Sequence, residues 1–133
     1  MSTRSDELAV RTAVDQLVAA FGRGDLPAYF GAFHRDASFL FYTTPRPLEG
    51  VDSYRSEWDR WASVDGFEVL ECRTSDTRVE VWSDVAIVTH AVATRSRTHA
   101  GVADTHERET IVFQRQADGR WLAIHEHLSP APD

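Results

Sequence analysis

The sequence has one cysteine, Cys72, and no long apolar run, and both features exclude broad classes of protein. One cysteine cannot form an intramolecular disulfide, and it cannot build a metal site that needs several thiolates. No stretch approaches the roughly 18 consecutive apolar residues of a membrane-spanning helix, and the N-terminal residues lack the apolar segment of a secretory signal. We therefore expect a cytoplasmic protein with no membrane partner.

Positive charge is scarce as well. The chain carries 14 lysine and arginine residues against 21 aspartate and glutamate residues, which gives a net charge of −7 and a pI near 5.3. This balance disfavours nucleic acid as a partner because the phosphate backbone repels an acidic protein. Internal repeats and low-complexity segments are missing, and 133 residues suit one folded unit. We expect a single domain over residues 1–133 with no nucleic-acid partner.

The first part of the chain predicts helices. Apolar residues at helical spacing indicate an amphipathic helix over residues 5–22, which Gly22 and Gly24 end. Asp25 can cap a short second helix with Pro27 in its first turn.

A strand and a third helix follow. The aromatic residues of 37–42 indicate a strand that ends at Tyr42, and the proline-containing stretch after it reads as a loop. A third helix over residues 51–63 places Trp58 on its apolar face.

From Gly66 onward the pattern is that of β-strands. One strand runs to Trp82 through a bulge near Ser75-Asp76, and Ser83-Asp84 can close a hairpin with the next strand, residues 85–97. That strand turns at His99-Ala100-Gly101.

The length of the loop at His99-Ala100-Gly101 decides which residues face inward. A three-residue loop places His90 opposite Thr110 on the next strand, whereas a two-residue Ala100-Gly101 loop flips the strand and points Arg95 and Arg97 inward. We prefer the three-residue loop because it keeps the valines of both strands on the helix-covered face.

The last hairpin spans residues 108–129 around Asp118-Gly119, a dipeptide typical of two-residue turns. Such a turn places Thr110 opposite His127 and Arg108 opposite Ser129. Since strand side chains alternate between faces, one face of the hairpin is polar and the other is apolar. The polar face of the hairpin is predicted to point inward. His90 of the preceding strand is predicted to point the same way, so the inward-facing polar set is His90, Arg108, Thr110, His125 and His127. The apolar face, predicted to point outward and to form a homodimer interface, carries Ile111, Phe113, Leu122, Ile124 and Leu128.

The ending R-x-T-x-V…D-G-R-W-x-x-x-H-E-H-x-S resembles the SnoaL-like branch of the NTF2-like superfamily, and it is similar to the association domain of calcium/calmodulin-dependent kinase II. The resemblance implies an α+β fold, a cone in which three N-terminal helices pack on a strongly curved antiparallel sheet with a pocket at one end. It also implies either an isomerase, cyclase or lyase or a non-catalytic pocket protein, because the superfamily holds both kinds.

Clustered polar residues on the buried side of a sheet indicate a pocket, because burying them without one is costly. We interpret His125 and His127 as acid/base catalysts, in place of the aspartate base of the family, which is missing from the inner face of the last strands. Arg108 stays charged and presents a fork suited to a carboxylate or a phosphate. The further predicted substrate-binding residues are Thr110, His90, Tyr42 and Trp58.

The predicted ligand is therefore a small organic molecule with an anionic or carbonyl oxygen. The alternative is a non-catalytic ligand-binding or oligomerisation module like the kinase association domain. The H-x-H pair could hold a metal with His90, but no carboxylate faces these histidines in this register, so we expect no metal and no cofactor.

Overall fold

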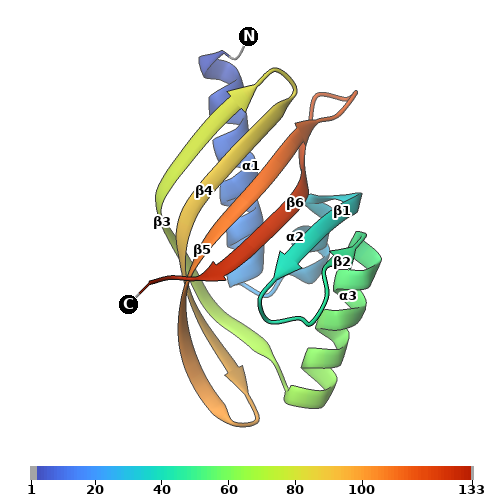
Figure 1. Cartoon of the computed structure of the whole chain (residues 1–133), viewed down its shortest axis with the longest axis vertical. Helices are drawn as coiled ribbons and strands as arrows, with labels where there is room; N and C mark the ends of the chain where they lie inside the picture. The colour runs from blue at the N-terminus through green and yellow to red at the C-terminus, as the bar shows by residue number, and fades with distance from the viewer. Residues whose placement is uncertain (1–2, 133) are drawn as a thin grey trace.

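The structure, a computed structural model, describes residues 3–132 and has the expected α+β architecture, with helices on one face of a curved six-stranded sheet (Figure 1). The strand order is β2-β1-β6-β5-β4-β3, and all neighbours are antiparallel except β1 and β6, which run parallel. The elements are α1 (Arg4–Gly22), α2 (Leu26–Gly31), β1 (Phe33–Phe41), β2 (Leu48–Glu49), α3 (Val51–Arg60), a π-helical turn (Trp61–Asp65), β3 (Glu68–Trp82), β4 (Val85–Thr98), β5 (Gly101–Arg115) and β6 (Trp121–Pro130). The three predicted helices are confirmed, whereas the short strand β2 lies in a stretch that was predicted to be loop. No helix within residues 3–132 is long and apolar enough to cross a membrane.

Side-chain caps mark the starts of α1 and α2. Thr3 and Asp6 form a capping box: the Thr3 hydroxyl accepts from the Asp6 N–H at 3.0 Å, and the Asp6 carboxylate accepts from the Thr3 N–H at 3.3 Å. Asp25 caps α2 by accepting from the Ala28 N–H, with Pro27 in the first turn as expected. Each cap satisfies amide groups that a helix leaves unpaired at its start.

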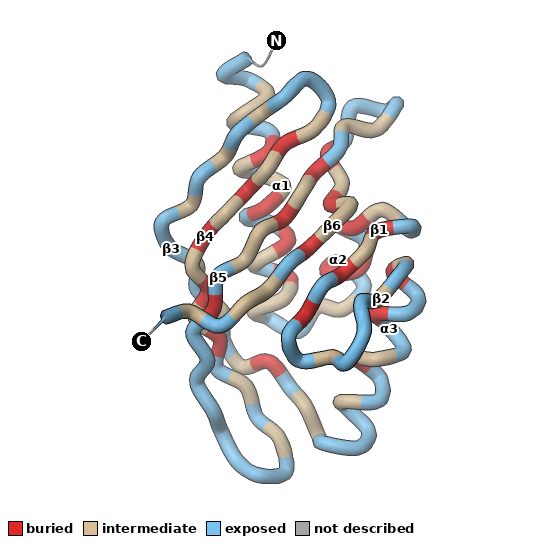
Figure 2. Tube along the Cα trace, viewed as in Figure 1, coloured by how far each residue is buried: buried red, intermediate tan, exposed pale blue. Residues whose placement is uncertain are grey.

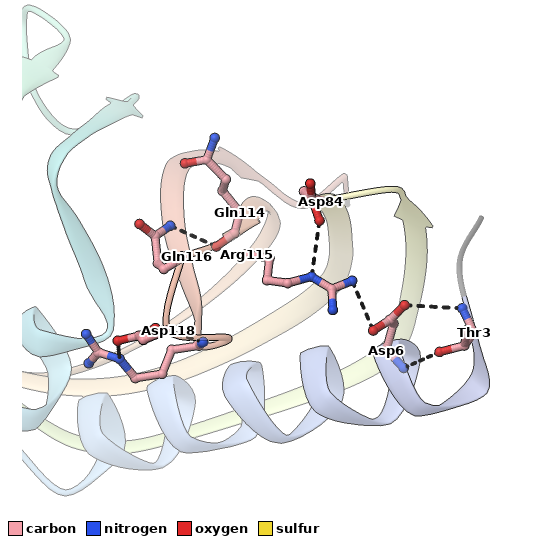
Figure 3. A network of polar contacts seen from close by, with 8 residues as sticks. Thr3, Asp6, Asp84, Gln114, Arg115, Gln116 and Asp118 are labelled. Carbon is pink, nitrogen blue, oxygen red and sulfur yellow. Dashed lines mark hydrogen bonds and ion pairs between the residues drawn. The ribbon is translucent and has the colours of Figure 1, made fainter.

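Arg115 joins three elements at the end of the sheet that lies near the start of α1 (Figure 3). Its guanidinium lies 3.1 Å from an Asp6 carboxylate oxygen in α1 and 3.2 Å from one of Asp84 in the turn between β3 and β4. The hydrogen bond from Arg115 lowers the pKa of the Asp6 carboxyl. A lowered carboxyl pKa adds stability above its unfolded value of 3.8, and that stability is lost as the pH falls.

The hydrophobic core lies between the inner face of the sheet and the helices, and Figure 2 shows its buried positions alternating along β4, β5 and β6. α1 contributes an apolar stripe that packs on the sheet, and β1 contributes aromatic rings. The fully buried members with large side chains are Tyr29, Phe39, Phe113, Ile111, Val10, Val14 and Val88. The core is therefore aromatic on the side of α2 and α3 and aliphatic beneath α1.

The β3–β4 hairpin has the turn and the bulge that the sequence predicts. Ser83 and Asp84 form its two-residue loop, Trp82 pairs with Val85, and a bulge follows Ser75, where Asp76 has a positive φ of 55°.

The β5–β6 hairpin has the predicted register away from its turn, with Arg108 opposite Ser129 and Thr110 opposite His127. The turn itself differs, because Gln116 N–H donates to the Arg120 carbonyl and encloses three residues instead of two. Gly119 occupies the left-handed region there, with φ 87°, as a three-residue hairpin loop requires. An irregularity in β6 next to Val112 then shifts the register back by one residue, so the two differences cancel.

The β4–β5 hairpin departs from the sequence prediction by one residue, and this shift reverses both last strands. Its loop is His99-Ala100, with Thr98 opposite Gly101, so neither loop considered from the sequence is correct. The His99 N–H donates to the Asp65 carbonyl at 2.8 Å, which docks the hairpin tip on the π-helical turn. As a result His90 lies opposite Glu109 rather than Thr110.

Because side chains alternate along a strand, the shift exchanges the inner and outer faces of β5 and β6. Ile111 and Phe113, predicted to lie outside, are fully buried, and Glu126 is buried beside them. The inner and outer sets are therefore the reverse of the prediction along β5 and along β6 from His125 onward, whereas Leu122, between the turn and the irregularity, stays on the outer face as predicted.

Paired substitutions can test this face assignment. Phe113→Ala should lower the free energy of unfolding by about 3–5 kcal/mol because it leaves a cavity in the core, and Val112→Ala on the outer face should cost about 1 kcal/mol or less. Urea unfolding with a common m-value measures both losses. A larger loss in Val112→Ala than in Phe113→Ala would contradict the observed register.

Candidate functional site

A cavity of about 300 Å³ lies between the inner face of the sheet and the helices. Its lining residues come from every helix and from β1, β3, β4, β5 and β6. It extends toward the tip of the β4–β5 hairpin, which reaches past the end of α3 in Figure 1. The residues that line it are Leu17, Val18, Phe21, Tyr29, Phe41, Tyr42, Thr43, Tyr54, Trp58, Trp61, Asp65, Phe67, Cys72, Val92, Thr94, Ser96, Thr98, Thr105, Glu107, Glu109, Glu126 and Leu128. This size and mixed lining suit a small organic molecule.

Aromatic rings form the wall of the cavity on the helical side. Trp58 packs between Tyr54, at a centroid distance of 6.0 Å, and Phe67, at 5.3 Å, and Trp61 packs against the same two rings. Helical spacing in α3 puts Tyr54 and Trp58 on one face, and the π-helical turn then directs Trp61 to the same cavity.

Two tyrosines of this wall form a buried hydroxyl pair. The Tyr29 and Tyr54 hydroxyl oxygens lie 2.8 Å apart. Burial, and then the charge of Glu126, raises the pKa of both phenols well above 10. Both hydroxyls therefore stay protonated and serve as hydrogen-bond groups near the carboxyl of Glu126.

The polar part of the cavity is a cluster on three adjacent strands: a buried histidine, a buried carboxyl and a carboxyl whose side chain is 10% exposed. His90 on β4 lies directly opposite Glu109 on β5, and His90 Nε2 is 2.6 Å from Glu109 Oε1. Glu126 on β6 is only 4% exposed and lies within hydrogen-bonding reach of Glu109. Glu126 Oε1 has no hydrogen-bond partner among the described residues. We call His90, Glu109 and Glu126 the carboxyl cluster.

The surroundings of the carboxyl cluster shift its two carboxyl pKa values in opposite directions. Burial raises the pKa of Glu126 well above 4.5, and the neighbouring Glu109 carboxyl raises it further. Burial also acts to raise the pKa of Glu109, but hydrogen bonds with Glu126 and His90 outweigh it and lower the value. The two shifts therefore favour the proton on Glu126 and the ionised form of Glu109.

Glu107 is a third carboxyl of the cavity. It lies two residues before Glu109 on β5, so it faces the same side of the sheet, nearer the tip of the β4–β5 hairpin. The Tyr42 hydroxyl donates to Glu107 Oε2 at 2.5 Å, which connects the turn after β1 to β5 at the cavity wall. Burial raises the pKa of Glu107, although the Tyr42 hydrogen bond opposes this, and burial together with Glu107 raises the pKa of Tyr42 to about 12.

Cys72 also lines the cavity, and it is a neutral thiol. Burial raises its pKa to about 11, so the reactive thiolate is rare near neutral pH.

The structure brings together only part of the site that the sequence predicts. Tyr42 and Trp58 line the cavity, and His90 lies directly behind Glu109. The one-residue shift at the β4–β5 loop places the other four predicted residues on the outer face of the sheet, away from the cavity: Arg108, Thr110, His125 and His127.

His125 illustrates the outer environment. Its Nδ1 lies 2.8 Å from the Ser38 hydroxyl of β1, and burial and the neighbouring His127 lower its pKa. These contacts hold the ring against β1 and not against the cavity.

The residues that sequence reasoning missed are Glu107, Glu109 and Glu126. They alternate with the predicted residues in the segments E-R-E and H-E-H, residues 107–109 and 125–127. The available signal was this alternation, and only the choice of face separated the two sets.

The charge of the cavity is one-sided. Among the described residues its lining includes the four carboxyls of Asp65, Glu107, Glu109 and Glu126 but no arginine, lysine or histidine side chain. Within residues 3–132 no group of three or more histidine, cysteine or acidic residues is placed to hold a metal ion.

The curved sheet with helices on one face is similar in fold to solved structures that include NTF2-like and ketosteroid isomerase-like proteins. A ketosteroid isomerase-like protein from Erwinia carotovora atroseptica has a TM-score of 0.81 at 19% identity, over 98% of this chain and 100% of that chain. An NTF2-like protein of unknown function from Pseudomonas putida has a TM-score of 0.77 at 18% identity, over 100% and 92%. A protein from Catenulispora acidiphila, solved in complex with S-DNPA, has a TM-score of 0.77 at 14% identity, over 95% and 93%.

The family follows from the sequence itself. Residues 10–133 match the model of the SnoaL-like domain, so the chain belongs to the SnoaL-like domain family, as its ending suggested. No curated protein sequence matches the chain.

The raised pKa of Glu126 predicts how the unfolding free energy changes with pH. Below 4.5 this carboxyl is protonated in both the folded and the unfolded chain, and as the pH rises only the unfolded chain loses the proton, so folding becomes less favourable. Glu126→Gln removes this cost while it keeps a hydrogen-bond donor beside Glu109. Relative to wild type, its gain in unfolding free energy should grow by about 1.4 kcal/mol for each pH unit above 4.5, for as long as Glu126 keeps its proton in the folded protein.

The control for this measurement is Glu80→Gln, which removes the same charge from an exposed position on β3. Urea unfolding of both variants over the pH range gives the comparison. If Glu126→Gln and Glu80→Gln changed the unfolding free energy by the same amount at every pH, Glu126 would not be a protonated carboxyl in the folded protein.

Proposed function

We propose that the protein binds a small organic molecule in the cone cavity and catalyses proton transfer on it through the carboxyl cluster. The observation that supports this is the pair Glu109 and Glu126, two neighbouring carboxyls that line the cavity with little exposure and whose pKa values move apart. Two titratable groups with opposite shifts supply an acid and a base in one site.

The roles follow from the protonation states. Glu126 carries a proton and is the acid that donates to a carbonyl oxygen of the ligand. Glu109 is ionised and is the base that takes a proton from the carbon next to that carbonyl. The resulting enol returns to a ketone when Glu109 gives the proton back at the same or another carbon and the oxygen returns its proton to Glu126. The reaction class is isomerisation, or cyclisation or elimination through the same enol.

His90 is a positioning residue in this proposal. It lies behind Glu109, its side chain is 1% exposed, and its hydrogen bond lowers the pKa of Glu109. It therefore orients the base and keeps it ionised. The acid/base chemistry that the sequence assigned to His125 and His127 is assigned here to carboxyls that face the cavity.

The ligand suited to the cavity has an apolar, ring-containing body. Tyr54, Trp58 and Trp61 offer flat surfaces for such a body, while the hydroxyls of Tyr29 and Tyr54 supplement the carboxyls at the polar end. The lining lacks a cation, so an anionic carboxylate on the ligand is disfavoured, in contrast to the expectation that rested on Arg108.

We also propose a homodimer through the outer face of the sheet, a single domain over residues 1–133, and a cytoplasmic location. The outer face carries partly exposed apolar residues on neighbouring strands, with Ile87 opposite Val112 and Leu122 on β6 close by. The interface residues therefore differ from the apolar set that the sequence suggested, since Ile111 and Phe113 are core residues.

Proton exchange on a simple ketone tests the chemistry. Benzylacetone in D₂O should incorporate deuterium next to its carbonyl in the presence of the protein, and NMR follows the loss of the proton signals. Glu109→Gln should slow the exchange by about 100-fold or more because it removes the base. His90→Asn should shift the acidic limb of the pH profile to higher pH, since Glu109 loses the hydrogen bond that lowers its pKa.

Two matched variants on the outer face are the controls, His125→Asn and His127→Asn, and both should retain the wild-type exchange rate. If they abolished exchange while Glu109→Gln retained it, the outer-face histidines would carry the chemistry and this proposal would be overturned. Circular dichroism confirms that each variant is folded.

The dimer has its own test. Light scattering should give twice the chain mass of 15.0 kDa, and Ile87→Arg should shift the mass to that of one chain because it buries a charge in the interface. Arg78→Ala, at an exposed position near the edge of the sheet, is the control. A strict monomer at all concentrations would contradict the proposed interface.

A further inference from the structure

The carboxyl groups of the cavity suggest more about the ligand than its size. Glu107, Glu109 and Glu126 all point into one aromatic-walled space, and the described lining offers no cationic side chain against them. The one histidine in contact, His90, lies behind Glu109 and is shielded from the cavity. The space therefore has more negative than positive groups available to a ligand.

A second observation points to a missing partner. Glu126 is 96% buried, lines the cavity, and has one carboxyl oxygen, Oε1, without a hydrogen-bond partner among the described residues. Buried polar atoms in folded proteins are nearly always paired, so this oxygen lacks a donor that an occupant of the cavity can supply.

The aromatic wall favours a positive charge on that donor. Tyr54, Trp58 and Trp61 present ring faces and edges within one small space, and ring faces attract a cation, most strongly when it is desolvated. Carboxylates together with aromatic rings form the usual environment for a bound ammonium group.

We propose that the ligand is an amine that binds as its ammonium ion, held by the carboxyls of Glu107, Glu109 and Glu126 against the aromatic wall. This inference rests on the binding part of the proposed function, because it names the chemical class of the molecule that occupies the same cavity. With an ammonium ion bound, Glu126 is ionised and is not the acid of the carbonyl chemistry. The ammonium N–H groups donate to Glu126 Oε1 and to the ionised Glu109.

Binding of an ammonium ion should change the protonation of Glu126. The groups that face this carboxyl from the surrounding elements are Glu107, Glu109, His90, Tyr29, Tyr54 and Cys72. None of them brings a permanent positive charge, and burial and Glu109 raise the pKa of Glu126, so the protein's own groups favour its protonated form. An ammonium ion supplies that charge, and Glu126 then releases its proton to solvent while its carboxylate pairs with the ligand.

Three probes that share one skeleton separate the alternatives. They are benzylacetone, which is neutral; the amine that has an amino group in place of its carbonyl oxygen; and hydrocinnamate, which has a carboxylate in place of the acetyl group. Isothermal titration calorimetry at about pH 7 measures their affinities, and quenching of the fluorescence of Trp58 and Trp61 checks that they occupy the cavity. The amine should bind about 10-fold more tightly than the ketone, and hydrocinnamate should bind least.

Repeating the titration in buffers of different ionisation heat measures the protons released. Amine binding to the wild type should release a substantial fraction of a proton, whereas ketone binding should release none. Glu126→Gln should abolish this release, and Glu109→Gln should weaken the amine by about 10-fold while it leaves the ketone affinity nearly unchanged. Glu80→Gln, which removes an equal charge from the exposed face of β3, should bind all three probes like the wild type.

The outcomes distinguish the two proposals. If the ketone binds as tightly as the amine, or if Glu80→Gln weakens the amine as much as Glu109→Gln does, the ammonium site is overturned while the proposed cavity function stands. If none of the three probes quenches the tryptophans or produces binding heat, both proposals fail together.

Discussion

The burial of Glu109 and Glu126 beside one histidine is the constraint on which the rest of the site depends. Two carboxyls removed from water cannot both be charged at close range, so one keeps its proton and the other is stabilised by hydrogen bonds. Their positions on neighbouring strands make this unavoidable, since β5 and β6 place them on the same face of the sheet. A folded structure that tolerates such a pair has a cavity for it, and here the cavity is lined by aromatic rings.

The surrounding fold keeps these carboxyls apart from the packed core. The aliphatic core beneath α1 is fully packed, with Val14, Val88 and Ile111 almost completely buried. The polar residues begin where this core ends, at His90 and Glu109. Farther along the strands the docked tip of the β4–β5 hairpin extends the cavity wall, through the hydrogen bond from His99 to Asp65. The residues that pack the core and the residues that line the cavity therefore lie on different segments of the same strands.

Much of the fold could be predicted from the sequence because its signals are local. The capping residue Asp25 marks the start of α2, the turn Ser83-Asp84 closes one hairpin, and the ending of the chain resembled a family that the match over residues 10–133 confirms. The candidate site was predicted less well, since each of its residues depends on the face of a strand. Because the loop His99-Ala100 is one residue shorter than the predicted loop, Glu109 faces the cavity in place of Arg108.

The sequence by itself determined the order of helices and strands, the acidic balance of the chain, and the two alternating segments E-R-E and H-E-H from which the site had to come. Tertiary structure alone decided which half of each segment faces the cavity. The physical reason is that strand alternation has a period of two, so a shift of one residue at a turn leaves every local preference intact and reverses every side chain that follows. The docking of the hairpin tip on Asp65, a contact between residues 34 positions apart, accompanies the observed choice.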